Sequence, residues 1–310
     1  MASLWAMDLR QLNAVVAVAD FGSFSAAADA LHTVQSNVST HVARLERELG
    51  VVLVDRAAGR LTGEGEVVVA RARRVQAELE ALSADVASLR DEVAGLVRLG
   101  IIGTTARWLM PPLLTAVAER HPKVRILTLE ANTTALLPQL VAGSLDIGVV
   151  NLPALDPDIV VEPVFEEELI LVTPPDHPLA RARHVGLREL AEHELLLTPP
   201  GTSIRVLLDE VAEAEGVQLR PKAELDGLRL IASLCFEGFG AGILPATAIP
   251  RWPTTGDWRV VPLPHLPRRC VALACRKRAL ASAPSRVVQE VIRDVVADQA
   301  AAHRGVHLTG

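Results

Sequence analysis

Short polar side chains gather on one arc of the segment HTVQSNVSTHVARLERELG, residues 32–50. In a helix, at roughly 100° per residue, its apolar residues form the opposite arc: Val34, Val38, Val42, Leu45 and Leu49. Lys, Glu and Gln would be better helix formers on a solvated face than Ser36 and Thr40. Hydroxyl and guanidinium groups can instead hydrogen bond to base edges and phosphates. The polar arc therefore suggests contact with nucleic acid.

The flanking sequence supplies the elements that would hold this helix. Residues 8–20 and 24–32 both show helical patterns, and Ser23 or Ser25 can cap the second one. Gly50 ends the third helix, and the stretches 51–55 and 60–62 fit a small hairpin. Three helices followed by a hairpin predict a winged helix-turn-helix over residues 7–63.

In such a fold the third helix enters the major groove, where long outer side chains would hold it away from the base edges. Gln35 is the first candidate for a base contact because it opens this helix. The predicted contacts to base edges or phosphates are Gln35, Ser36, Ser39, Thr40 and Arg44. Arg47 and Arg56 are predicted phosphate clamps, and Arg60 on the hairpin is a candidate for minor-groove or backbone contact.

A long helix is predicted to follow as a linker over residues 64–94. Its apolar positions recur at steps of three and four, as in a coiled coil: Val68, Ala72, Val75, Leu79, Leu82, Val86 and Leu89. A single helix cannot bury this seam alone, so either a partner helix or the chain's own body must cover it.

The charge of the predicted DNA-binding domain also favours two copies. Residues 1–63 hold five basic and six acidic residues, a net charge of −1. Two copies joined through the linker would double the DNA contacts, on a near-palindromic site.

From residue 95 to 300, short β-rich runs alternate with helical ones, which predicts parallel sheets covered by helices. We expect two α/β lobes joined by two crossings, near Val164 and near Leu263–Arg269. The first lobe would comprise about 95–164 and 269–300, and the second about 165–268. A cleft between such lobes suits a small ligand.

Several stretches resemble the LysR-type transcriptional regulators. The similarity covers residues 23–56 and 60–66, and continues in LMPPLLTAVAERHPKV, LVAGSLDIGVV and FGAGILP. Val54 stands where the family commonly has Phe, Ser36 where it often has Pro, and Val34 where Ser is frequent. The resemblance implies a winged helix-turn-helix, a linker helix and a two-lobed domain resembling periplasmic binding proteins. It also implies a homodimer or homotetramer on double-stranded promoter DNA that responds to a small-molecule effector, with RNA polymerase as a further candidate partner.

Hydroxyl side chains at three predicted helix starts are candidates for effector binding. The candidates are Thr104, Thr105, Thr133, Thr202 and Ser203. Helix N-termini bind anions, so a carboxylate effector is one expectation, although ordinary capping would also explain these residues. In the family arrangement the three starts would converge on one cleft. Arg107 or Arg205 could add charge, and Phe239 could line the cleft.

Composition narrows the remaining choices. The 310 residues carry a net charge of −6, so any DNA contact must be local. Charges, Pro or Gly interrupt every apolar run, and MASLWAMDLR does not read as a signal peptide, so we expect a cytoplasmic protein without membrane contact. Met1 and Met7 are both candidate starts.

The sequence leaves three alternatives to a ligand-responsive regulator. An enzyme is disfavoured because no GxSxG, HExxH, Walker or CxxC motif is present. A solute-binding protein is disfavoured by the winged N-terminus. A redox-responsive regulator of the same family would need Cys235, Cys270 or Cys275, and the last two face opposite sides of a predicted strand. No metal or cofactor is expected from three unpatterned cysteines.

Overall fold

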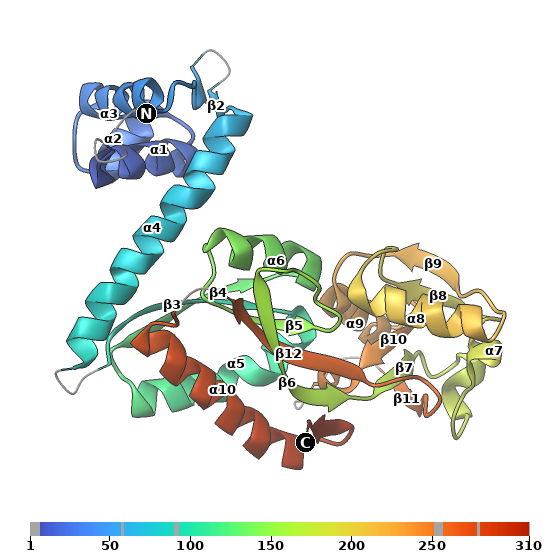
Figure 1. Cartoon of the computed structure of the whole chain (residues 1–310). Coiled ribbons are helices and arrows are strands. Elements are labelled where there is room, and N and C mark those ends of the chain that lie inside the picture. The colour runs from blue at the N-terminus through green and yellow to red at the C-terminus, as the bar shows by residue number, and fades with distance from the viewer. Residues whose placement is uncertain (1–6, 57–58, 90–92, 251–256, 278–279, 310) are drawn as a thin grey trace. The chain divides into compact units, whose positions relative to one another are not determined.

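The computed structural model describes residues 7–56, 59–89, 93–250, 257–277 and 280–309. Residues 57–58 of the predicted hairpin and 90–92 of the predicted linker lie outside the described residues. The chain divides into two compact units, one up to Leu82 and one from Ser83 onward, apart from Ala142–Ser144, which are grouped with the first. Each unit is coloured along the chain in Figure 1.

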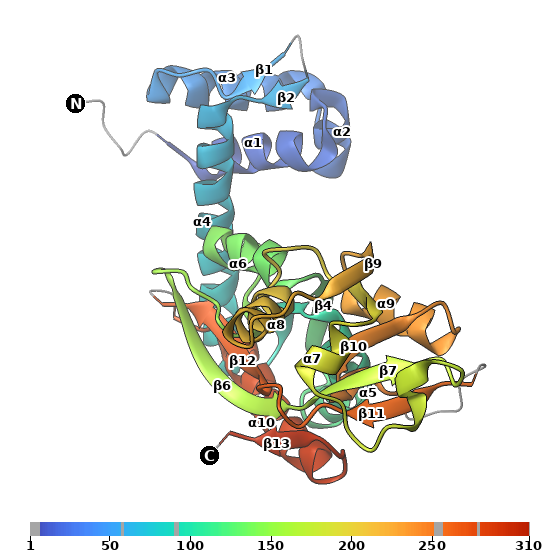
Figure 2. The ribbon, with the colours of Figure 1, turned by 90° about the vertical axis from the view of Figure 1, so that its right-hand side faces the viewer.

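The first unit is a winged helix-turn-helix, as predicted (Figure 2). Its elements are α1 (Leu9–Phe21), α2 (Phe24–Ala30), α3 (Gln35–Leu49), β1 (Val54–Asp55), β2 (Arg60–Leu61) and the start of α4 (Gly63–Ser88). Asp8 and Gln11 form a reciprocal capping box at α1, and the Ser23 side chain accepts from Ala26 N at α2. Gly50 ends α3 with φ 73°, which favours glycine.

The apolar arc of α3 packs into the core of this unit. Val38, Val42 and Leu45 are at most 1% exposed, beside apolar residues of α1 and α2. Two residues of the predicted arc do not join this core, because Val34 is 60% exposed and Leu49 is 37% exposed. Val34 is the N-cap residue, so its extended backbone turns the side chain off the helical arc.

The α4 helix has an apolar seam that is covered only near its start. Ala72 is buried and Val68 packs against the core of the first unit. Farther along, Val75, Leu79, Leu82 and Val86 are between 39% and 60% exposed. This exposed seam is a surface that a second helix could cover.

The second unit has two lobes, each built on one sheet. Lobe I has the strand order β13-β6-β12-β5-β3-β4. Its strands are β3 (Gly95–Ile101), β4 (Val124–Glu130), β5 (Ile147–Asn151), β6 (Ile159–Glu167), β12 (Arg269–Arg276) and β13 (Val306–Leu308). Its helices are α5 (Gly103–Arg120), α6 (Thr133–Ala142) and α10 (Ala283–Ala301). In Figure 1, α6 lies on one side of the sheet and α5 with α10 on the other.

Lobe II has the strand order β11-β7-β10-β8-β9. Its strands are β7 (Leu169–Thr173), β8 (Glu194–Leu197), β9 (Arg220–Glu224), β10 (Ala241–Pro245) and β11 (Arg259–Pro262). Its helices are α7 (Leu187–Leu190), α8 (Ser203–Ala214) and α9 (Leu228–Phe236), with short 3-10 turns η1 (Pro178–Arg181) and η2 (Ala246–Ala248). Leu171 packs in the core with α8, whereas its neighbour Val172 packs with α9, so the two helices cover opposite faces.

The expectation of purely parallel sheets was wrong, because both sheets are mixed. In lobe I, β3 pairs in parallel with β4 and β5, but β12 runs antiparallel to β5 and β6. The chain returns from lobe II in β12, and this return reverses its direction. The first crossing lies at Glu168, between β6 and β7, rather than near Val164. The second lies between β11 and β12, at residues 263–268.

Candidate functional site

The outer face of α3 presents the residues predicted to contact DNA. Gln35, Ser36, Thr40, Arg44 and Arg47 are exposed. Ser39 is half-buried. The Thr40 hydroxyl donates to the Ser36 carbonyl at 2.7 Å, which holds that side chain close to the helix. The face is thus shallow, polar and accessible.

The N-terminus of α3 leaves backbone donors available to an anion. Val34 is the N-cap, and its apolar side chain makes no capping hydrogen bond. The first N–H groups of a helix have no partner within the helix. Together with the helix dipole they favour a phosphate group.

The two predicted wing arginines are placed differently. Arg60 is exposed at the start of β2. Arg56 lies 3.6 Å from Glu46 and stacks over the Phe24 ring, 5.5 Å from its centroid. Arg56 therefore packs against the domain, while 53% of its side chain stays exposed to solvent.

Glu46 is a positioning residue that sequence reasoning missed. Its Oε1 accepts from the backbone N–H groups of Leu53 and Val54, at 2.9 and 3.2 Å. These bonds tie the start of the hairpin to α3. An acidic residue near a DNA-binding face gives no sequence signal for this role.

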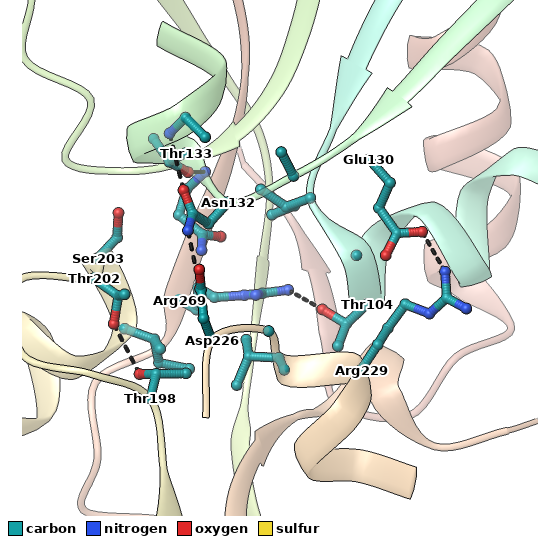
Figure 3. A pocket seen from close by; sticks show the side chains of 18 residues that line it. Thr104, Glu130, Asn132, Thr133, Thr198, Thr202, Ser203, Asp226, Arg229 and Arg269 are labelled. Carbon is teal, nitrogen blue, oxygen red and sulfur yellow. Dashed lines mark hydrogen bonds and ion pairs between the residues drawn. The ribbon is translucent and has the colours of Figure 1, made fainter. Parts of the chain in front are cut away.

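In the second unit, a cavity of about 310 Å³ lies between the two lobes (Figure 3). It opens at the carboxyl ends of strands from both sheets, where ligands bind in open α/β folds. Four of the predicted effector residues line it: Thr104, Thr133, Thr202 and Ser203. The sequence analysis thus predicted lining residues of the cavity on both lobes.

Four helices begin at this cavity. Residues at the starts of α5, α6, α8 and α9 all line it. The starts of α5, α8 and α9 have no side-chain cap, and Asn132 Oδ1 caps α6 by accepting from Ala135 N at 2.9 Å. The Thr202 hydroxyl lies 2.8 Å from Thr198 Oγ1 rather than on a helix amide. Capping therefore does not account for Thr104, Thr202 or Ser203.

Two predicted effector residues do not line the cavity. Thr105 is fully buried behind it. Phe239 precedes β10, which runs parallel to β8, whereas the cavity lies where β8 ends. Phe239 is therefore at the opposite edge of the sheet, and is 58% exposed.

Arg269 is the main cavity residue that the sequence did not reveal. Its side chain is 2% exposed, and its Nε donates to Glu167 Oε1 at 2.9 Å. Its Nη2 donates to Thr104 and Thr105 hydroxyls at 3.1 and 3.3 Å. A charged residue at the start of an apolar strand was the available signal, but its partner lies 102 positions earlier.

The two lobes are also linked at the cavity rim. Asn132 Nδ2 of lobe I donates to Asp226 Oδ1 of lobe II at 3.0 Å, and Arg229 forms an ion pair with Glu130. All four residues line the cavity. Of the two arginines proposed to add charge, Arg205 is bound to Asp209, Glu224 and the Thr198 carbonyl and Arg107 is not among the lining residues.

The cysteines lie away from the cavity. None of the three thiols is among its lining residues. Burial raises the pKa of Cys235 to about 12 and that of Cys275 to about 11. Burial, followed by the negative charge of Glu166, also raises the pKa of Cys270. Thiols with raised pKa values are weak nucleophiles at neutral pH.

Among the residues that the structure describes, no helix is long and apolar enough to cross a membrane. The same residues contain no group of three or more His, Cys, Asp or Glu side chains arranged to hold a metal ion.

Two protein families match the two units. Residues 9–66 match the bacterial regulatory helix-turn-helix proteins of the lysR family, and residues 90–297 match the LysR substrate binding domain. A probable hydrogen peroxide-inducible genes activator of Streptomyces viridosporus is 33% identical over 297 residues, covering 94% of this chain and 95% of the relative.

Two further proteins are similar to this chain over most of its length. The DNA-binding transcriptional dual regulator OxyR of Escherichia coli K12 is 30% identical over 275 residues, covering 87% of this chain and 90% of OxyR. A full-length OxyR variant from Pseudomonas aeruginosa matches with a TM-score of 0.74 and 28% identity, covering 93% of this chain and 94% of that one.

Proposed function

The chain belongs to the LysR family and is a DNA-binding regulator of transcription, and from this premise we propose how it works. It binds promoter DNA as a homo-oligomer through α3 and the wing. A small molecule in the cavity of the second unit modulates that binding. The protein regulates rather than catalyses, and acts in the cytoplasm, where promoter DNA is found.

The outer face of α3 is the observation that carries the proposal. Its exposed groups are short or flexible donors and acceptors, and its N-terminus offers uncapped amides. Gln35 and Arg44 can reach adenine or guanine edges, while Ser36 and Thr40 let the backbone approach. Arg47 and Arg60 are exposed and can contact phosphates.

Oligomerisation follows from weak electrostatics and the exposed seam. Because residues 1–63 have a net charge of −1, one copy has little general attraction for DNA. Pairing of two α4 helices along the seam from Val75 to Val86 would cover apolar surface and bring two α3 helices to one site. A dimer is the minimal unit, and a tetramer would double it.

Fluorescence anisotropy tests this function. The full chain is titrated onto DNA from upstream of its own gene and onto a scrambled duplex, at two salt concentrations. A preference for the native DNA that survives higher salt is expected, because base contacts do not depend on counterion release. Equal binding to both duplexes, abolished by salt, would contradict sequence-specific regulation through this DNA.

A second candidate is a response to hydrogen peroxide, which the names of the relatives suggest. The raised pKa values of the three thiols argue against a thiol mechanism. Peroxide is therefore added to the same anisotropy assay with wild type and with Cys235→Ser and Cys270→Ser variants. A peroxide effect that disappears in either variant would favour the redox reading over a reversibly bound effector.

A further inference from the structure

Two buried polar atoms at the cavity have no partner among the described residues. They are Nη1 of Arg269 and Oδ1 of Asn151. Arg269 is 2% exposed, Asn151 is 7% exposed, and both residues line the cavity. An unsatisfied buried polar group destabilises the folded protein, so proteins rarely keep one without a use. Arg269 Nη1 is a charged donor, and Asn151 Oδ1 is an acceptor.

The donor is the remaining arm of a guanidinium that is otherwise fully engaged. Arg269 Nε binds Glu167, and Nη2 binds both Glu167 and the hydroxyls of Thr104 and Thr105. These bonds fix the guanidinium plane, and Figure 3 shows the one to Thr104. Thr104 Oγ1 accepts from Arg269, so its hydroxyl hydrogen remains to be donated. A ligand atom beside Nη1 would therefore meet two adjacent donors.

The surroundings favour a negative charge on that ligand atom. Glu167 already neutralises Arg269, so the attraction must come from elsewhere. The uncapped N-termini of α5, α8 and α9 lie at the cavity, and each carries a partial positive charge. At the rim, Glu130 is paired with the cation of Arg229, whereas Asp226 accepts a hydrogen bond from the neutral amide of Asn132, which does not offset its charge. A planar carboxylate matches both the donors and the local field.

The same residues connect the cavity to the crossings between the lobes. Glu167 is the last residue of β6, and Arg269 is the first of β12, so the pair spans both crossings. Glu167 Oε2 accepts from the Thr247 backbone of lobe II at 2.9 Å, while Arg269 holds the start of α5 in lobe I. A ligand bound to Nη1 would pull on the bonds that set the angle between the lobes.

We propose that Arg269 binds the carboxylate of a small organic acid, and that Asn151 accepts a hydrogen bond from a hydroxyl or amino group of the same molecule. The effector is therefore a hydroxy or amino acid rather than an uncharged compound. This inference rests on the proposed function, in which the cavity receives the effector.

Three small probes test the assignment: glycolate, acetate and glycolamide. Each is added to the full-length protein in a carboxylate-free buffer at matched ionic strength, and the shift in Tm is measured. A ligand that binds only the folded state raises Tm. We expect glycolate to raise Tm more than acetate does, and glycolamide to leave it unchanged. Equal effects of glycolate and acetate, any rise with glycolamide, or no rise with either acid would overturn the proposal.

Substitutions locate the binding. Arg269→Met combined with Glu167→Gln removes both buried charges, so no unpaired charge is left to unfold the protein. We expect this double variant to bind glycolate at least about tenfold more weakly. Thr104→Val, a milder change, should weaken binding less. Arg293→Met, on the surface of lobe I, is the matched control and should bind as wild type does. Undiminished glycolate binding by the double variant would place the acid elsewhere.

The DNA assay separates failure of this inference from failure of the proposed function. One outcome is glycolate binding that depends on Arg269 in a protein without sequence-specific DNA binding. This outcome would support the acid site and contradict the proposed DNA-binding function. The opposite outcome is specific DNA binding by a protein that fails the glycolate test. It would support the proposed function as a regulator and contradict the acid site.

Discussion

Gly65 at the start of α4 lies directly against Leu53 of the preceding segment. A Cβ atom added to Gly65 would stand 2.0 Å from the Leu53 carbonyl oxygen, which is a backbone atom and cannot rotate away. The Thr62 hydroxyl accepts from Gly65 N at 3.0 Å and donates to the Val52 carbonyl at 2.7 Å, which fixes the same junction. The junction between wing and α4 therefore depends on a missing side chain.

Gly65→Ala is expected to destabilise the first unit by about 1–3 kcal/mol or more, because the added methyl must displace the backbone. Urea unfolding followed by circular dichroism measures the change. Gly63→Ala is the control, since a Cβ there meets nothing within 4 Å. Equal stability of the two variants would contradict the close contact.

Gln35→Ala and Arg44→Ala are each expected to weaken specific DNA binding by about 1–3 kcal/mol, the usual cost of a lost base contact. Arg47→Ala should instead weaken binding to native and scrambled duplexes alike and reduce the salt dependence, as expected of a phosphate contact. Anisotropy over a salt series distinguishes the two patterns. Arg188→Ala in lobe II is the control for loss of one exposed positive charge.

Leu82→Glu is expected to shift the protein towards monomers and to weaken DNA binding, because it places a charge in the middle of the exposed seam of α4. Sedimentation velocity gives the oligomeric state. Ala81→Glu adds the same charge on the opposite arc of the helix and should leave the state unchanged. If both variants keep the wild-type oligomer, α4 does not mediate assembly.

Glu167→Ala is expected to lower the free energy of unfolding by about 3–5 kcal/mol, because it leaves Arg269 charged and buried without its partner. Denaturant unfolding measures the loss. Glu162→Ala removes the partner of Arg293 at the exposed surface and should cost about 1 kcal/mol or less. Similar losses in the two variants would mean that the buried pair contributes no more than a surface pair.

His177 is expected to make lobe II less stable in acid. Burial, and then the charge of His193, lowers the pKa of His177, and Asp176 opposes them. His177 Nδ1 also accepts from Leu179 N at 3.2 Å, which a protonated ring cannot do. Because the folded pKa lies below the unfolded value of about 6.5, stability is full above that value and falls as the pH drops below it.

His177→Asn keeps an acceptor at this turn but does not titrate. Urea midpoints of wild type and variant are compared at about pH 7.5 and pH 5.5, on either side of the ordinary histidine pKa. The wild type should lose more stability between the two conditions. An equal loss in both proteins would assign the acid sensitivity to other groups.

Periodicity, together with caps and turn residues, was enough to predict the first unit and the position of α3. The spacing from Val38 to Leu45 fixed the buried arc, and Gly50 marked the end of the helix. Periodicity does not contain strand direction, however, so the antiparallel return of β12 was not foreseen. That direction is set by the chain's path through lobe II.

The candidate cavity was predicted in part for a similar reason. Hydroxyls at helix starts are local signals, and Thr104, Thr133, Thr202 and Ser203 were found from them. Arg269 pairs with a residue 102 positions earlier, and Asn151 N donates to the Thr133 hydroxyl 18 positions earlier, so no local pattern marks either residue. Phe239 was misplaced because a glycine-rich turn does not reveal which edge of the sheet it occupies.

The order of strands in lobe I also constrains how the protein is made. Strands β12 and β13 and helix α10 belong to lobe I but are synthesised only after all of lobe II. Lobe II is one continuous segment and can fold as it leaves the ribosome, whereas β5 and β6 must wait for β12 to pair between them. The ion pair of Glu167 with Arg269 is therefore a late event in folding, and the cavity is completed only after the lobe that forms its far wall.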